Sequence, residues 1–352
     1  MKCSLSCAVI CLLSCLLLPG CNKDEFTVGS GTASPDGSTA SGVHMINAGT
    51  YTAHPFFTEQ WGSADASSEL TAMAYDAADD MFFWIKGRPS ANNELMRYNF
   101  SNGRIEDVYS FTSQYDYGLR VFGNEMWIVR TYDTSLVRLT SLAGAAPVVQ
   151  ASYMPRGSQP AFHDVNDVAM VNGDLYFITG NFLVQPKYEG LQCLRGPDYS
   201  AIEHVTPEIW PSSNYSNERY IVSVGTGSES RFVIAMGVAA SDRVTTPLAL
   251  ELRDASGNLI RTQEGYGNSY LEKDSKNRIY TVQTYHSPLR ILRWSAELER
   301  CEMFSVHTST KLENCFARLF VVRERKADSV DVIMTEYRTQ SSPTFEMVTL
   351  PK

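Results

Sequence analysis

The amino-acid sequence predicts an all-β fold built from similar units that repeat along the chain. The 352 residues include 18 Tyr and 16 Phe, and the apolar runs that contain them are short. Short runs rich in aromatic and β-branched residues are typical of strands. These runs recur at intervals of about fifty residues, a spacing found in repeat folds. With 20% charged and 43% hydrophobic residues, the composition excludes a largely disordered chain.

Residues 1–20 are predicted to be a targeting segment. Lys2 supplies a positive start, and the stretch from Leu5 to Leu18 is apolar apart from small Ser and Cys residues. This stretch is too short to span a bilayer and has the length of a signal-peptide core. The ending Leu18-Pro19-Gly20-Cys21 resembles the lipobox of bacterial lipoproteins, which implies that Cys21 carries acyl chains such as palmitate. The alternative is an ordinary secretory signal that happens to end in Cys.

The segment after Cys21 is predicted to be an anchor followed by a tether. Asn22-Lys23-Asp24-Glu25 resembles the surface-export signal of lipoproteins from the Bacteroidetes, which implies an outer-membrane lipoprotein that faces outward. Residues 29–42 are almost wholly Gly, Ser, Thr, Ala, Pro and Asp, a composition typical of flexible linkers. We therefore expect a signal peptide over 1–20, an anchor and linker over 21–42, and a single domain over 43–352.

Each repeated unit has the same predicted order of strands. A hydrophobic marker strand follows a tight polar turn such as Asn172-Gly173, which can supply the positive φ of a hairpin. One strand precedes this turn, a third follows the marker across a longer loop, and a fourth is visible in most units. The predicted first strands are 70–75, 119–122, 168–171, 220–224, 270–273 and 317–322. The marker strands are 81–85, 126–129, 175–178, 232–235, 279–282 and 332–334.

Four antiparallel strands at this repeat length predict a β-propeller with six blades. The sixth unit reaches Lys352 without a fourth strand, and we expect residues 43–58 to supply it and so close the ring. A pair of β-sandwiches and a seventh blade within residues 179–231 are the alternatives. The architecture over 43–352 resembles the six-bladed TolB-like and NHL-type propellers, although it has no WD, YWTD or kelch motif.

The sequence excludes several kinds of chemistry. Its net charge of −9 argues against a nucleic-acid partner, because phosphate binding needs a basic face. It has no phosphate loop, zinc-ligand spacing or Gly-x-Ser-x-Gly elbow, and no cofactor is predicted. After the anchor the cysteines are Cys193, Cys301 and Cys315. The last two could form a disulfide in an oxidising compartment, or all three could be buried thiols.

The two faces of such a ring are expected to differ. The turns from first to second strand and from third to fourth strand are short and open on one face, here called the short-turn face. The loops from second to third strand and between blades are long and open on the other, the long-loop face. Long loops on a rigid scaffold commonly carry function, so we expect a ligand site there, at the mouth of the central channel. The candidate ligand-binding residues are Asp116, Tyr117, Arg130, Tyr132, His163, Asp164, Asn268, Tyr285, His286, Tyr337 and Arg338.

Two groups within this set indicate specific chemistry. His163-Asp164 is followed by Asn166-Asp167, and such oxygen ligands suit Ca²⁺, which the resemblance to six-bladed lactonases also allows at the channel. The alternative is that these residues cap loops, and we predict no metal. Tyr285-His286 directly follows a marker strand, where a general base could lie.

These features predict a binding module rather than a defined enzyme. Aromatic faces beside Arg, Asn and Asp suit a sugar or a peptide. The resemblance to Bacteroidetes lipoproteins implies a role in a nutrient-uptake assembly at the outer membrane. A hydrolase or lyase that uses paired carboxylates such as Asp116 and Asp164, or a metal, is the first alternative. A protein–protein interaction scaffold is the second.

Overall fold

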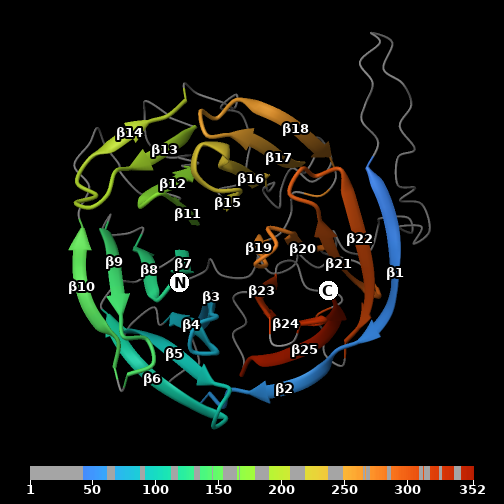
Figure 1. The fold of residues 1–352 in the computed structure, drawn as a ribbon. Coiled ribbons are helices and arrows are strands. Elements are labelled where there is room, and N and C mark those ends of the chain that lie inside the picture. The colour runs from blue at the N-terminus through green and yellow to red at the C-terminus, as the bar shows by residue number, and fades with distance from the viewer. Residues whose placement is uncertain are drawn as a thin grey trace, which may run out of the picture. The chain divides into compact units, whose positions relative to one another are not determined.

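In the computed structural model the chain forms a ring of six β-sheets, as predicted (Figure 1). The sheets lie within one compact unit, Val43–Lys352. The structure describes residues 43–61, 68–87, 92–111, 118–130, 135–144, 146–153, 165, 167–178, 190–206, 219–236, 249–264, 266, 270–283, 287–308, 312, 318–324, 327–336 and 342–352. Within these residues no helix is long and apolar enough to cross a bilayer.

The first three blades each contain four antiparallel strands in chain order from the centre of the ring outward. Blade 1 consists of β3 (Glu69–Asp76), β4 (Met81–Gly87), β5 (Asn93–Asn99) and β6 (Arg104–Phe111). Blade 2 consists of β7 (Gly118–Phe122), β8 (Glu125–Arg130), β9 (Ser135–Thr140) and β10 (Val148–Tyr153). Blade 3 consists of β11 (Val168–Val171), β12 (Asp174–Ile178), β13 (Leu191–Leu194) and β14 (Ile202–His204).

The other three blades follow the same plan around the ring. Blade 4 consists of β15 (Arg219–Val224), β16 (Arg231–Met236), β17 (Ala249–Asp254) and β18 (Leu259–Glu264). Blade 5 contains β19 (Glu272–Lys273), β20 (Ile279–Gln283), β21 (Leu289–Trp294) and β22 (Arg300–His307). Blade 6 contains β23 (Arg318–Arg323), β24 (Ser329–Glu336) and β25 (Thr344–Pro351).

The strand predictions hold closely, with two differences. Every predicted marker strand forms the second strand of a blade. In blade 5 the inner strand is shorter than predicted, because only Glu272 and Lys273 pair with β20. In blade 3 the outer strand β14 was not predicted, since its three residues, Ile202–His204, include two polar side chains and give no apolar run.

The segment that follows the predicted tether closes the ring, as expected, but it does so on two blades. β2 (His54–Thr58) pairs antiparallel with β25 and is the fourth strand of blade 6. β1 (His44–Thr52) pairs in parallel with β22 and is a fifth strand of blade 5. Because one continuous segment spans both outer edges, it links the last two blades as well as closing the last one.

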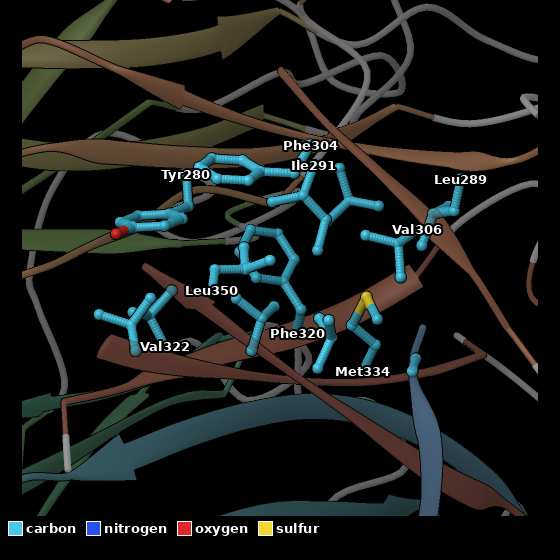
Figure 2. Close-up of a cluster of buried hydrophobic side chains, with 14 of the residues drawn as sticks. Tyr280, Leu289, Ile291, Phe304, Val306, Phe320, Val322, Met334 and Leu350 are labelled. Atoms are coloured by element: carbon cyan, nitrogen blue, oxygen red, sulfur yellow. The ribbon is translucent and has the colours of Figure 1, made fainter. Parts of the chain in front are cut away.

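The hydrophobic core is divided among the seams between neighbouring blades. Each of six buried clusters joins side chains of two adjacent blades, in the order of the ring. Figure 2 shows the cluster between blades 5 and 6, in which Phe304 and Ile291 of one blade pack with Phe320 and Met334 of the next. A pair of sandwiches would bury two cores, so the seams exclude that alternative. The described residues likewise form six blades and no seventh.

The structure describes two of the three cysteines for which the sequence allowed either a disulfide or buried thiols. Cys193 and Cys301 are free thiols buried in the sheets, while Cys315 lies outside the described residues. Burial raises the pKa of the Cys193 thiol to about 11 and also raises that of Cys301. Both are therefore protonated, unreactive core groups at neutral pH.

Candidate functional site

Of the predicted site residues, only Arg130 lies within the described part of the chain. It ends β8, so it lies where that strand reaches the long-loop face. Its guanidinium carbon lies 5.9 Å from the centroid of the Phe111 ring in the neighbouring blade, in a cation–π contact. The other ten candidates, like Asn166 and Cys21, lie outside the described residues. They remain predictions.

The described residues contain a different charged cluster, whose side chains come from the inner strands and from the residue directly before β11. Figure 1 shows these inner strands around the centre of the ring. We call Arg120, Asp167, Glu272 and Lys273 the channel cluster. Arg120 lies on β7 in blade 2, and Glu272 lies on β19 in blade 5. These blades are opposite in a ring of six, so the contact between the two side chains crosses the channel.

Arg120 is the centre of this cluster. Its Nε and Nη2 donate to the two carboxylate oxygens of Asp167, each at 2.6 Å, which is the two-pronged geometry that binds a carboxylate most tightly. Its Nη1 donates to Oε1 of Glu272 at 2.6 Å, and Nη2 also donates to the Leu271 carbonyl at 2.7 Å. Burial alone would lower the pKa of Arg120, but the two carboxylates outweigh burial and raise it.

Asp167 ties blades 3 and 4 to this arginine. It directly precedes β11, and its Oδ1 accepts the backbone N–H of Val168 at 2.9 Å. Its Oδ2 accepts the backbone N–H of Ile221, on the inner strand of blade 4, at 3.0 Å. The buried carboxylate therefore accepts four hydrogen bonds, so its charge is matched and its orientation is fixed. Through it and Arg120, four of the six blades are joined at the centre.

Glu272 and Lys273 of the cluster also have shifted pKa values. Burial raises the pKa of Glu272 to about 7, although the nearby Arg120 charge opposes the shift. Burial and repulsion from Arg120 lower the pKa of Lys273, whose Nζ donates to the Ser223 carbonyl of blade 4 at 2.6 Å. A carboxylic acid that titrates near neutral pH inside a channel is the kind of group found at functional sites.

The channel cluster does not suit a divalent cation. Both oxygens of Asp167 accept N–H donors, and the Arg120 guanidinium occupies the position between the two carboxylates. No group of three His, Cys, Asp or Glu side chains that could hold a metal gathers anywhere in the described ranges. Asp167 is the only residue of the predicted Ca²⁺ motif that the structure describes, so the choice between a Ca²⁺ site and loop capping stays a prediction.

A second ion-pair group, centred on the buried Arg323, joins blades 6 and 1 at their seam. Arg323, at the end of β23, donates from Nε and Nη2 to the two oxygens of Asp80 in blade 1, each at 2.5 Å. Its guanidinium also lies 3.5 Å from the centroid of the Phe100 ring, and its Nη1 donates to Asp331 at 3.2 Å. This group lies at the short-turn face, so we assign it to ring closure and not to a site.

The sequence did not single out Arg120 or Glu272, and it included Asp167 only as part of the Ca²⁺ motif. The signal that could have found them is a charged side chain inside a predicted inner strand. Leu-Arg-Val at 119–121 and Leu-Glu-Lys at 271–273 both place charge where other strands are apolar. Only the closed ring shows that these positions meet across the channel.

Comparison with known proteins establishes the fold. No protein-family profile matches the chain, and no curated protein matches its sequence. The calcium-binding protein regucalcin from Agrobacterium tumefaciens matches with a TM-score of 0.51 and 12% identity, over 88% of this chain and 97% of its own. A gluconolactonase from Xanthomonas campestris matches with a TM-score of 0.51 and 10% sequence identity, over 86% of this chain and 97% of the gluconolactonase. A protein of unknown function from Dyadobacter fermentans matches with a TM-score of 0.56 and 10% sequence identity, over 85% of this chain and 99% of that protein. At these identities the likeness concerns the fold alone: the chain is a six-bladed β-propeller.

Proposed function

We propose that this chain is an outer-membrane lipoprotein, anchored through Cys21, whose propeller binds a glycan or a peptide at the channel mouth on the long-loop face. The binding module would act at the cell surface, within a nutrient-uptake assembly. The observation that carries the proposal is the channel cluster, because its hydrogen bonds join four blades at the centre of the ring.

The cluster supports binding in two ways. It is a rigid base, since Arg120 and Asp167 hold each other by two short hydrogen bonds and each also contacts the backbone. Loops that recognise a ligand bind best when their scaffold does not rearrange. In addition, Arg120 neutralises carboxylates that would otherwise make the channel acidic, so the floor of the site would not repel a neutral sugar or a peptide carboxylate.

Binding is tested with the lipidated protein in detergent on arrays of bacterial and plant glycans and of short peptides, followed by calorimetry on any hit. Arg130→Ala removes a cation from the long-loop end of β8, and we expect it to weaken binding by about tenfold, the effect of losing about 1.4 kcal/mol. The control is Arg104→Ala, at the short-turn end of β6, which should leave the affinity unchanged. No hit on either array, or an equal effect of the two variants, would contradict the proposed site.

Anchoring is tested separately. Expression in a Bacteroidetes host followed by intact-mass measurement should show a mature chain that begins at an acylated Cys21. Cys21→Ser should lose the acyl mass and leave the membrane fraction, and protease added to whole cells should degrade the wild-type protein. Retention of the Cys21→Ser variant in the outer membrane would contradict a lipid anchor, whatever the result of the binding experiment.

One observation favours the alternative of an enzyme. The raised pKa of Glu272, about 7, is what a general acid or base needs at neutral pH. A glycosidase or lyase that used it should lose all turnover in Glu272→Gln and show a rate that changes with pH near 7. Unchanged turnover in that variant would exclude this carboxylate from catalysis.

A further inference from the structure

The register of β1 shows at which face of the propeller the chain enters the first blade that it joins. His44 pairs with Arg300, the first residue of β22, and its backbone N–H donates to the Glu299 carbonyl at 2.9 Å. Glu299 belongs to the turn between β21 and β22, the third and fourth strands of blade 5, and such turns open on the short-turn face. The chain that follows Cys21 therefore joins the propeller on the short-turn side, away from the long loops.

The exposed apolar side chains of the described residues lie on this same side. The large hydrophobic residues that are exposed are Ile105, Val148, Val149, Leu259 and Ile260. Each is one of the first two residues of an outer strand, β6, β10 or β18, directly after the short turn from the third strand. Single exposed apolar residues are common on any protein, but here they all occupy the same position in three blades.

Their distribution around the ring fits a flat contact. Ile105 lies in blade 1 and the pair Leu259-Ile260 in blade 4, which is opposite in a ring of six. Val148-Val149 lies in blade 2, opposite blade 5, where His44 joins the chain to its tether. Contact points on two pairs of opposite blades would hold the short-turn face of the propeller parallel to a flat surface.

The same strands are poorly suited to pairing with another β-strand. The register of β10 shifts directly after Val149, and that of β18 shifts beside Leu259. Such bulges interrupt the row of backbone groups that an added strand would need. Contact through the side chains alone is what an acyl-chain surface offers. The net charge of −9 disfavours adsorption to a lipid surface by charge, so a contact of this face with such a surface would depend on its apolar side chains.

From these observations we propose that the short-turn face rests on the lipid bilayer, with Ile105, Val149 and Ile260 at the headgroup boundary and the long-loop face directed away from the membrane. The inference rests on the proposed lipid anchor at Cys21. The 21 residues between Cys21 and Val43 would have a root-mean-square span of roughly 25 Å as a flexible chain, which would keep the short-turn side close to the bilayer.

The test uses lipidated protein in vesicles of phosphatidylethanolamine and phosphatidylcholine, with a photo-crosslinking amino acid at one position at a time. Ile105 is compared with Ser110 on β6, and Ile260 with Glu264 on β18. Each control is an exposed residue at the long-loop end of the same strand. We expect lipid adducts at 105 and 260 to exceed those at 110 and 264 by about fivefold or more, since only the former would lie in the interface.

The outcomes separate this inference from the proposed anchor. Equal adducts at the two ends of both strands, in protein whose mass shows an acylated Cys21, would overturn the orientation and leave the anchor intact. Protein without acyl chains would instead contradict the anchor. Ile105→Lys combined with Ile260→Lys should lower adducts at position 149 while the protein stays acylated and folded by circular dichroism. Unchanged adducts at 149 would also overturn the orientation.

Discussion

Glu272→Gln tests the electrostatics of the channel cluster most directly. Gln has nearly the same shape as Glu, and its carbonyl oxygen can still accept the Arg120 Nη1 hydrogen bond. The substitution removes the ionisable group of Glu272, a largely buried carboxylate whose side chain is only 18% exposed. Any difference between the variant and the wild type in how stability depends on pH therefore reports the titration of this one group.

The magnitude follows from the raised pKa. Burial moves the pKa of Glu272 from 4.5 to about 7, and each pKa unit corresponds to about 1.4 kcal/mol, so about 3 kcal/mol of stability depends on pH. Between these two values the folded protein holds a proton that the unfolded chain has lost. The stability contributed by the protonated group is therefore fully present below pH 4.5 and is lost as the pH rises through 7.

The assay is urea unfolding of wild type and variant at intervals from pH 4.5 to pH 8. We expect the free energy of unfolding of the wild type to fall by about 3 kcal/mol relative to Glu272→Gln over this range. The matched control is Glu302→Gln, since Glu302 also accepts a hydrogen bond from an arginine, Arg293, at 2.6 Å and is 22% exposed. The reasoning would be refuted if the free energies of unfolding of the wild type and of Glu272→Gln changed in parallel with pH. It would also be refuted if the difference between them changed no more with pH than the difference between the wild type and Glu302→Gln.

Three further predictions concern stability, each measured by urea unfolding at pH 7. Asp167→Asn should cost about 3–5 kcal/mol, because it leaves a buried guanidinium without its two-pronged partner; a loss below 1 kcal/mol would contradict the assigned network. Arg323→Lys should lower the free energy of unfolding by about 1 kcal/mol, since Lys cannot bind both oxygens of the half-exposed Asp80. A variant as stable as the wild type would argue against a stabilising ion pair between blades 6 and 1. Gly257→Ala should cost about 2 kcal/mol, because its φ is +81° and the added Cβ would lie 1.9 Å from Cγ2 of Thr206. Thr206→Ser removes that methyl group and keeps the hydroxyl that accepts the Leu191 N–H, so it should restore part of the loss, and no rescue would mean that the clash is not the cause.

Local patterns were sufficient to predict the blades. The turn at Asn172-Gly173 adopts positive φ at both residues, 53° and 88°, as the hairpin signal requires. The apolar marker strands are buried because they lie in the middle of each sheet, packed on both faces. The short strand β14 was missed because an outer strand packs on fewer neighbours and therefore needs less apolar sequence.

The candidate site was predictable only in part. Alternation of short and long connections indicates which face carries the long loops, and Arg130 does end a strand at that face. The channel cluster could not be inferred, since Arg120 and Glu272 are 152 residues apart and nothing in either local segment specifies the partner. Each position alone would be interpreted as an exposed charge on a strand.

The sequence by itself determined that this protein is a ring of six β-sheets, because hydrogen-bonded hairpins depend on short-range turn and strand patterns that each blade repeats. Tertiary structure alone decided that the closing segment also pairs with blade 5, and which side chains meet at the centre of the ring. The parallel register of β1 beside β22 and the crossing of the channel by Arg120 depend on contacts between residues far apart in the chain. Such contacts are stable only when all the blades are in place, because the buried charges need partners supplied by several of them at once.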